Sequence, residues 1–478
     1  MAVYDLLISG GYLVDPANGR EGRFDLAIEG DKVARVEQEI NHNLARQVWK
    51  AEGRLVLPGL IDTHVHLTPA TRAAGFHMLA AAGVTTALDC AGPVEAVLEG
   101  MALKGSGINV AVLNRLTPGG SLSGDQAPKG EVQAYVEKSL TDGAFGIKLL
   151  GGHLPLSPET TIFAIEAAND AGCYAAFHCG STQNGSNLHG FFDALEFTGD
   201  NHLQICHVNA YCRGMTHGNP AEETLLALKE LAERPHLVSE SHMGPLNSCW
   251  SRLNKDGVPY SHVTRTCLAS GCYSIDSQGL LAAAKDGYMQ VQRALPEQVI
   301  YLKPEEGTAY LKRIDFESMV SFPVNRRSTA FLCATAKNPE GNFIVSALST
   351  DGGAIPRNFL LSHGLALVRF DALSLEQLVQ KTSWTPARML GLFDKGHLAP
   401  GADADLAVVD SKSHTPVLTL AGGRIIMSGG EVIGTGGRLI TTGSGVKSLV
   451  KQRVEYEVAD LERSMFYTSS TVIPELAG

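Results

Sequence analysis

The first 57 residues alternate short apolar and polar stretches that end in glycine turns. The stretch Phe24–Gly30 alternates apolar and polar side chains, and Lys32–Val36 does the same after a turn. A period of two residues is typical of β-strands, so these two segments are predicted to form a hairpin. Short apolar strands with glycine pairs return from about residue 393 to residue 445. The simplest arrangement is one small β-sandwich domain formed by both chain ends, residues 1–57 and 393–445.

Between these ends, continuous apolar runs alternate with longer helical stretches such as Pro158–Ala171 and Glu222–Glu233. A continuous apolar run indicates a strand that is buried on both faces, as in a parallel sheet. Eight such runs predict an α/β fold, a (β/α)8 TIM-type barrel over residues 58–392. The runs cover residues 55–62, 84–89, 109–113, 146–150, 173–178, 203–207, 236–240 and 343–348.

Two segments do not fit a minimal barrel. About 100 residues, approximately 244–341, separate the last two runs, which is too long for a simple loop. We expect this insertion to form a lid or an elaboration over the barrel mouth. The more polar tail, residues 446–478, is expected to pack as an arm on the barrel or on another subunit.

The first run of the barrel ends in two histidines, His64 and His66. Residues two apart on a strand point to the same face, and the carboxyl end of a barrel strand lies at the catalytic mouth. Two imidazoles that converge there suit a divalent transition metal. The Pro58-Gly59 entry, the buried strand and Asp62 distinguish this motif from a chance histidine pair at the surface.

Further chemically active residues stand within or after other strands. Lys148 lies in the middle of an apolar run, where its charge is costly without a partner. Either carbamylation by carbon dioxide or a buried carboxylate partner would resolve that cost. His178 and His207 follow the fifth and sixth runs, and Asp351 follows the eighth. The aspartate suits both metal ligation and proton transfer.

This set resembles the ligand set of the amidohydrolase superfamily of metal-dependent hydrolases. The segments Pro386–Gly391 and Gly396–Leu406 also resemble signatures of that family. The resemblance covers residues 1 to about 440 and implies six metal ligands in chain order, with the lysine carboxylated. These are His64, His66, Lys148, His178, His207 and Asp351.

The resemblance implies hydrolysis of a C–N bond in an amide or cyclic amide, such as an N-acyl amino acid, a dipeptide-like compound or a cyclic ureide. Hydroxide bound between two divalent metals would attack the carbonyl, and Asp351 would carry the proton to the leaving nitrogen. Zinc is the expected metal, although manganese, iron and nickel accept the same ligands.

Assignment within the superfamily rests on fewer residues. Thr350-Asp351-Gly352-Gly353 is more similar to D-aminoacylases and isoaspartyl dipeptidases than to hydantoinases, and the chain as a whole resembles D-aminoacylases, dihydroorotases and hydantoinases. The His178 and His207 loops resemble the amidohydrolase-like subunit of formylmethanofuran dehydrogenase. Cys90 stands where D-aminoacylases place a cysteine ligand, so either it binds a single tight metal or it is a small buried hydrophobe.

Other polar residues near the predicted mouth could contact substrate, or could simply meet solvent or form salt bridges. Arg115 could hold a carboxylate through two contacts. The remaining candidates are His153, Asn209, Tyr211, Glu240 and His242. Asn325, Arg326 and Arg327 in the insertion could form a second anion clamp, or a solvated face.

Composition limits the alternatives. The chain has 478 residues, 44% hydrophobic and 19% charged, with a net charge of −11 that argues against nucleic-acid binding. No long apolar run or basic leader followed by an apolar core is seen, so we expect a cytoplasmic enzyme away from membranes. The nine cysteines fit a reducing compartment. The resemblance also implies a homo-oligomer, a dimer or tetramer. A deaminase of the same superfamily and a non-catalytic amidohydrolase-like subunit are the alternative functions.

Overall fold

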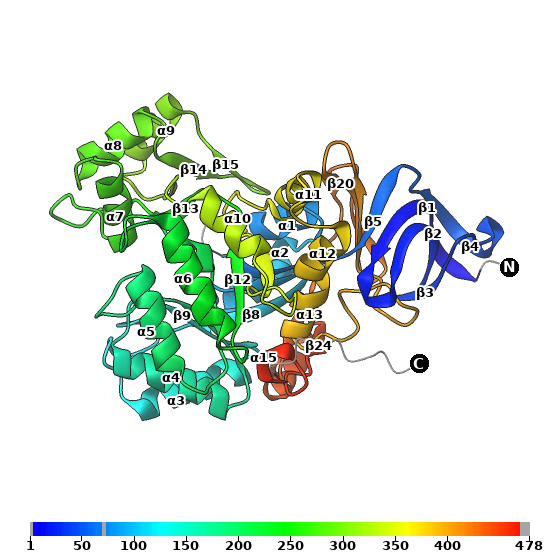
Figure 1. Cartoon of the computed structure of the whole chain (residues 1–478), viewed down its shortest axis with the longest axis horizontal. Coiled ribbons are helices and arrows are strands. Elements are labelled where there is room, and N and C mark those ends of the chain that lie inside the picture. The colour runs from blue at the N-terminus through cyan, green and yellow to red at the C-terminus, as the bar shows by residue number, and fades with distance from the viewer. Residues whose placement is uncertain (1–2, 69–72, 469–478) are drawn as a thin grey trace.

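The two chain ends share one nine-stranded sheet in the computed structural model, which describes residues 3–68 and 73–468. The predicted hairpin is confirmed, because β2 pairs antiparallel with β3. The N-terminal and C-terminal parts join where β5 pairs antiparallel with β19, at the right of Figure 1. The strands are β1 (Tyr4–Asp15), β2 (Arg20–Glu29), β3 (Lys32–Glu37), β4 (Ala45–Lys50), β5 (Arg54–Pro58), β19 (Leu406–Asp410), β20 (Thr415–Ala421), β21 (Arg424–Ser428) and β22 (Glu431–Val432).

The middle of the chain forms a closed ring of parallel strands, as the eight apolar runs predict. β17 pairs with β12 and β18 pairs with β6, so the ring closes through residues 347–353. The eighth predicted strand begins later than expected, since the backbone of Val345 instead accepts a hydrogen bond from Lys381. The strands are β6 (Leu60–His66), β7 (Val84–Asp89), β8 (Asn109–Arg115), β9 (Gly146–Leu150), β10 (Tyr174–His178), β11 (Gln204–Ile205), β12 (Val238–His242), β17 (Ala347–Ser349) and β18 (Gly352–Gly353).

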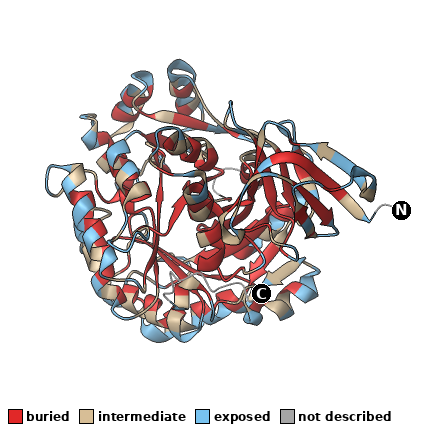
Figure 2. Ribbon diagram, turned by 45° about the vertical axis from the view of Figure 1, so that its right-hand side comes forward, coloured by how far each residue is buried: buried red, intermediate tan, exposed pale blue. Residues whose placement is uncertain are grey.

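Helices cover the outside of this ring, with buried residues on their inner faces and exposed residues on their outer faces (Figure 2). Their starts follow local capping rules. Asn219, for example, accepts hydrogen bonds from the first backbone N–H groups of α6. The helices are α1 (Ala74–Ala81), α2 (Val94–Lys104), α3 (Lys129–Thr141), α4 (Pro158–Asp170), α5 (Leu188–Thr198), α6 (Pro220–Ala232), α11 (Leu360–Arg369), α12 (Leu375–Val379) and α13 (Thr385–Met389). None of the described helices is long and apolar enough to cross a bilayer.

The insertion folds as a lobe of its own beside the mouth, at the upper left of Figure 1. Its sheet has the order β13-β16-β14-β15, and a separate apolar cluster that includes Leu268, Leu280 and Phe322 fills its interior. The elements are β13 (Asn247–Trp250), α7 (His262–Ser270), α8 (Ser277–Lys285), β14 (Gln290–Ala294), β15 (Val299–Tyr301), α9 (Pro304–Arg313) and β16 (Met319–Phe322). The last helix of the predicted insertion, α10 (Arg327–Thr335), packs instead on α6 and β12 of the barrel.

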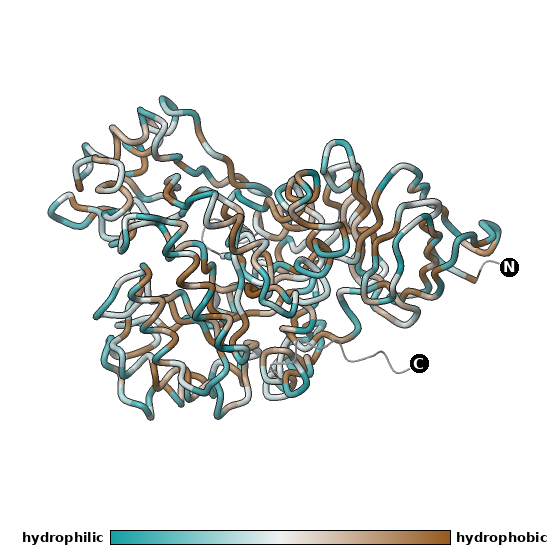
Figure 3. Tube along the Cα trace, in the orientation of Figure 1, coloured by the Kyte–Doolittle hydropathy of each residue, from teal (hydrophilic) through white to brown (hydrophobic). Residues whose placement is uncertain are grey.

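The last described segment packs against the barrel. β23 (Arg438–Thr441) pairs with β8, although the sequence assigned this stretch to the β-domain. Phe466 stacks on Tyr174 with ring centroids 4.2 Å apart, because both rings are apolar and buried. Hydrophobic positions recur through the barrel and the β-domain, while hydrophilic positions are frequent in the outer loops, as the tube in Figure 3 shows. The other elements here are α14 (Val446–Gln452), β24 (Tyr456–Val458) and α15 (Met465–Thr468).

Candidate active site

Three side chains converge at the barrel mouth where the first and last strands of the ring meet, His64 and His66 from β6 and Asp351 from the eighth strand. His66 Nε2 lies 2.8 Å and His64 Nε2 3.6 Å from Oδ1 of Asp351. Asp351 has a positive φ of 51° and stands between β17 and β18, the two halves of the eighth strand. The three ligand atoms lie close enough together to hold one metal ion. Nitrogen and carboxylate donors of this kind suit zinc and similar cations.

A buried arginine fixes the carboxylate of Asp351. Arg357 Nη2 lies 2.5 Å from Oδ2, and its Nε donates to the backbone carbonyl of Asp351 at 2.5 Å. Burial would raise the pKa of Asp351, but Arg357, His64 and His66 hold that pKa well below its ordinary value. The aspartate is therefore an ionised acceptor in a fixed orientation.

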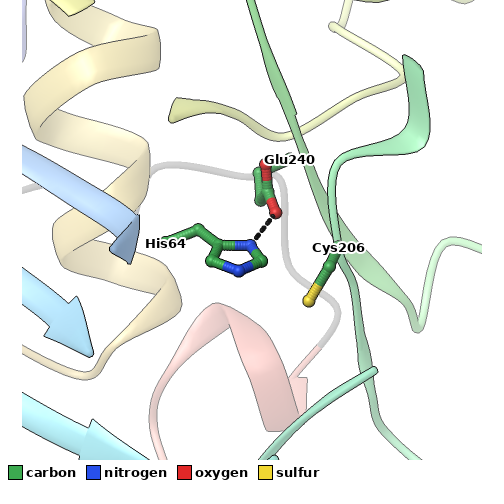
Figure 4. A group of neighbouring side chains, drawn as sticks. All are labelled: His64, Cys206 and Glu240. Carbon is green, nitrogen blue, oxygen red and sulfur yellow. Dashed lines mark hydrogen bonds and ion pairs between the residues drawn. The ribbon is translucent and has the colours of Figure 1, made fainter. Parts of the chain in front are cut away.

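Glu240 orients the His64 ring through the Nδ1 side (Figure 4). Its Oε1 lies 2.7 Å from His64 Nδ1 and accepts from the backbone N–H of His207 at 2.6 Å. A carboxylate that engages Nδ1 leaves Nε2 of the same ring available to a metal. Glu240 was expected at the substrate-facing mouth, but it is fully buried. Burial raises the pKa of this carboxyl to about 7, against the effect of its hydrogen bonds.

Lys148 is fully buried in β9, and its closest polar contact is a thiol rather than a carboxylate. Its Nζ lies 2.6 Å from Cys206 Sγ. Burial raises the pKa of Cys206 to about 12, so this thiol is neutral at pH 7. Among the described residues, no Asp or Glu forms an ion pair with Lys148. Cys206 also forms, with His64 and Glu240, a second group of possible metal ligands (Figure 4).

His178 and His207 complete the ring of imidazoles. Their centroids lie 4.4 Å apart, and the His207 ring stacks 5.1 Å from that of His64. His178 Nε2 lies 2.9 Å from Ser186 Oγ, and Gly152 leaves room for this imidazole, since a Cβ there would lie 2.0 Å from Nε2. His207 has a left-handed backbone with a φ of 31°, and burial lowers the pKa of its ring well below the ordinary value. A neutral imidazole is the form that binds metal.

Several buried polar atoms around these rings form no hydrogen bond to any residue the structure describes. They are His207 Nδ1, His242 Nδ1, Asn209 Nδ2 and Ser241 Oγ. Unpaired buried polar atoms are costly and rare, so their concentration at one end of the barrel fits groups left available for a ligand. The residues present therefore fit a metal site.

The predicted substrate contacts lie around this site in different settings. His153 is exposed, and its ring lies 5.1 Å from that of His178. Tyr211 is buried beside His207, and its hydroxyl accepts from the backbone of Cys179 at 2.9 Å. Arg115 donates to the carbonyl of Ala91 at 3.1 Å.

Asn209 and His242 are joined by one hydrogen bond. Asn209 Oδ1 accepts from the backbone N–H of His242 at 3.0 Å, and both side chains are buried. Cys90 is buried near Lys148 and belongs to neither group of three possible ligands among the described residues. Burial raises the pKa of Cys90 well above the ordinary value, as for a small hydrophobe.

Sequence reasoning missed Arg357 and Arg213. Arg357 stands six positions after Asp351, and an arginine so close to a predicted ligand was an available signal. Arg213 lies in a glycine-containing loop with no distinguishing pattern. In the insertion, Asn325 is buried while Arg326 and Arg327 are exposed, as for a solvated face.

Comparison with known proteins agrees with this geometry. A model of the amidohydrolase family matches residues 55–433. The chain belongs to the amidohydrolase family. This confirms the predicted superfamily, and the amidohydrolase is a hydrolase that acts on carbon–nitrogen bonds in amides or cyclic amides.

The amidohydrolase is 25% identical over 429 residues to a dihydroorotase of Pelotomaculum thermopropionicum, which covers 86% of this chain and 90% of the relative. Its fold is similar to that of a zinc-containing N-acyl-D-glutamate deacylase from Bordetella bronchiseptica, with a TM-score of 0.66, 16% identity, and 91% and 99% of the two chains covered. It is also similar to a chain of the formyltransferase/hydrolase complex of Methylorubrum extorquens, with a TM-score of 0.61, 17% identity, and 94% and 93% covered.

Proposed function

We propose that this amidohydrolase cleaves a small amide or cyclic amide at a centre of two divalent metal ions, zinc in the first instance. The observation that carries the proposal is the convergence of His64 and His66 on Asp351, with His64 oriented by Glu240. The ligands would be His64, His66, Lys148, His178, His207 and Asp351. A divalent cation held there would polarise the substrate carbonyl and lower the pKa of water.

Asp351 would accept the proton of the attacking water and return it to the leaving nitrogen. Its ionised, fixed carboxylate suits the first of these steps. Arg357 keeps that carboxylate oriented through two contacts, one to Oδ2 and one to the backbone. Arg357 is thus a positioning residue, because it acts through Asp351.

Lys148 is proposed to be carboxylated. The closest polar contact of this buried amine is a neutral thiol, and no described carboxylate lies within ion-pair distance to compensate a positive charge directly. Carboxylation would replace that cation with an anion that can bridge two metals. The alternative is one tight metal with Cys90 among its ligands, in which case Lys148 plays no part.

Metal content per chain distinguishes these two sites. Elemental analysis of wild type should give about two metals, falling to one or none in Lys148→Ala. Lys381→Met is a matched control, because Lys381 is also fully buried but donates to the carbonyl of Val345 instead. One metal that Lys148→Ala leaves in place would contradict the bridge and favour Cys90.

Turnover tests the reaction itself. Each variant should be assayed on N-acyl amino acids, dipeptides and cyclic ureides, with loss of activity in Lys148→Ala and retention in Lys381→Met. Activity that survives complete chelation of metal would contradict the proposal. Light scattering of the same samples tests the expected dimer or tetramer, and fractionation of cells tests the expected cytoplasmic location.

A further inference from the structure

Arg213 presents a guanidinium at the edge of the active site, in the loop six residues after His207. Its Nε and Nη2 donate to Asn325 Oδ1 at 3.1 and 3.0 Å, and Nη2 also reaches Asn247 Oδ1 at 3.3 Å. Both asparagines belong to the insertion and are buried. The barrel loop supplies the charge, and the insertion fixes the plane of the guanidinium.

No carboxylate compensates this charge. Within the described part of the chain, no Asp or Glu oxygen lies within ion-pair distance of Arg213, and its Nη1 forms no hydrogen bond. Two other arginines in sheltered positions differ. Arg357 is paired with Asp351, and Arg234 with Glu230 at 2.7 Å. Burial lowers the pKa of Arg213, yet a guanidinium stays charged in proteins. A sheltered, unpaired cation is expensive unless a ligand completes it.

Arg213 is linked to the candidate metal ligand His207 through two side chains, Asn325 and His242. Asn325 Nδ2 lies 3.5 Å from His242 Nε2, while Asn325 Oδ1 accepts from Arg213. The His242 ring in turn lies 6.3 Å from that of His207. Desolvation by the surrounding protein lowers the pKa of His153 to about 4 against the effect of Asp351, and the charges of His66, Arg213 and Arg357 lower it further, which places Arg213 near the same group of residues.

We infer that Arg213 binds a carboxylate of the substrate, so that this amidohydrolase prefers amides that carry an acid group beside the scissile bond. A planar guanidinium with one open side matches the two oxygens of a carboxylate. Asn325 and Asn247 would keep it in that orientation, which makes the insertion part of the specificity site. The inference rests on the proposed function and adds the substrate class to it.

Paired substrates test the inference. N-acetyl amino acids are compared with their neutral C-terminal amides, or cyclic ureides with and without a ring carboxylate, on metal-loaded wild type and Arg213→Gln. We expect kcat/KM for the acid to fall about 10- to 100-fold in Arg213→Gln, with the neutral partner changed less than about threefold. For Arg213→Lys, kcat/KM for the acid should lie between the values for wild type and Arg213→Gln, because lysine keeps the positive charge but cannot make a two-point contact with a carboxylate. Arg252→Gln, at an exposed ion pair with Glu317 in the insertion, should match wild type.

An equal loss on acidic and neutral substrates would overturn the inference. A preference that disappears in Arg115→Gln and persists in Arg213→Gln would overturn it as well, and assign the carboxylate to Arg115. A third contrary result is an Arg213→Gln variant whose kcat/KM is unchanged on both substrates while the alkylation rate of Cys267 changes, because a hydrogen bond with Cys249 and then the charge of Arg213 lower the pKa of that thiol.

Binding of a non-substrate anion separates this inference from the proposed function. Succinate should raise the unfolding temperature of metal-loaded wild type, and butane-1,4-diol should not. Arg213→Gln should lose the succinate shift while keeping its metal content, which also shows that the variant is folded. A wild type that hydrolyses no amide but shows the Arg213-dependent shift would contradict the proposed function alone. A shift that Arg213→Gln retains would contradict the inference alone.

Discussion

Two buried polar clusters of this chain differ in how completely they are paired. Where the β-domain meets the barrel, Lys395 contacts Asp403 at 2.5 Å, Asp405 at 3.0 Å and Glu457 at 3.4 Å. Asp405 also accepts from Asn109, and Asp403 from Lys32. At the mouth, by contrast, Lys148 meets a thiol, and His207 Nδ1 and His242 Nδ1 have no described partner.

This difference separates two uses of buried polarity. In the junction cluster, opposite charges are paired with one another, Glu457 Oε2 through ion pairs alone, so they fix how the two domains sit together. At the mouth, donors and acceptors stay incomplete within the described chain, which costs stability and leaves them free for metal and substrate. We therefore expect substitutions in the junction to affect folding, and substitutions at the mouth to affect chemistry.

The largest expected effect is the loss of activity in His207→Gln. The imidazole would no longer bind metal, so kcat/KM should fall by about 1,000-fold or more, about 4 kcal/mol of transition-state stabilisation. The free energy of unfolding of the metal-free protein should change by about 1 kcal/mol, because the ring nitrogen Nδ1 makes no hydrogen bond to the described chain. Activity within tenfold of wild type would show that His207 is not a ligand.

The next effect is on stability, in Lys395→Met. Removal of the cation leaves Asp403 and Asp405 buried without their main partner, so unfolding should become about 3–5 kcal/mol easier. Urea unfolding measures this loss, and specific activity per folded molecule should stay near that of wild type. Lys451→Met, at an exposed lysine of α14, is the control. A loss no greater than in the control would remove the contrast between the two clusters.

Metal addition should stabilise the mouth in turn. Zinc at about 100 times its dissociation constant should raise the free energy of unfolding by about 2.7 kcal/mol relative to the chelated protein. His66→Ala should lose this gain, whereas Lys395→Met should keep it despite its lower starting stability. An equal zinc shift in His66→Ala and wild type would place the metal elsewhere.

The smallest effect concerns Lys381 at the base of the barrel. Burial lowers the pKa of this lysine to about 7. Between pH 7 and 10 the unfolded chain therefore binds more protons at this residue than the folded chain does, so burial of Lys381 costs most stability below about pH 7 and progressively less as pH rises towards 10.

Replacing this lysine should remove that dependence. Lys381→Met should be about 1 to 3 kcal/mol more stable than wild type at pH 6, with a difference that shrinks towards pH 10. Chemical unfolding at both pH values measures this, beside Lys285→Met at an exposed lysine of α8. A pH-independent difference would show that Lys381 keeps an ordinary pKa.

The residues of the candidate site that the sequence could predict are those with a signal in their own stretch of chain. Lys148 was found because it interrupts an apolar run, and His64 and His66 because their spacing places both on one face of a strand. The barrel followed from apolar runs of the same kind. Two strands are much shorter than their runs: β17 begins late, and β11 ends early, since the backbone of His207 turns into the left-handed region soon after it.

Residues whose role depends on distant partners could not be predicted in this way. Arg213 lies in a polar loop, and its setting is made by Asn325, 112 positions later. The sequence predicts Glu240 as a substrate contact because it ends a strand, but its side chain is fully buried and contacts His64, which is 176 positions away. Neither separation leaves a trace in local periodicity.

The shared sheet of the two chain ends also constrains the order of folding. Lys32 meets Asp403, which is 371 positions further along the chain. Every barrel strand is synthesised between the two halves of that sheet, and pairings over such a separation form slowly. During synthesis, strands β1 to β5 are therefore made first, and β5 lacks its neighbour β19 until all the barrel strands have been made. Completion of the small domain would then report that the whole barrel has been made.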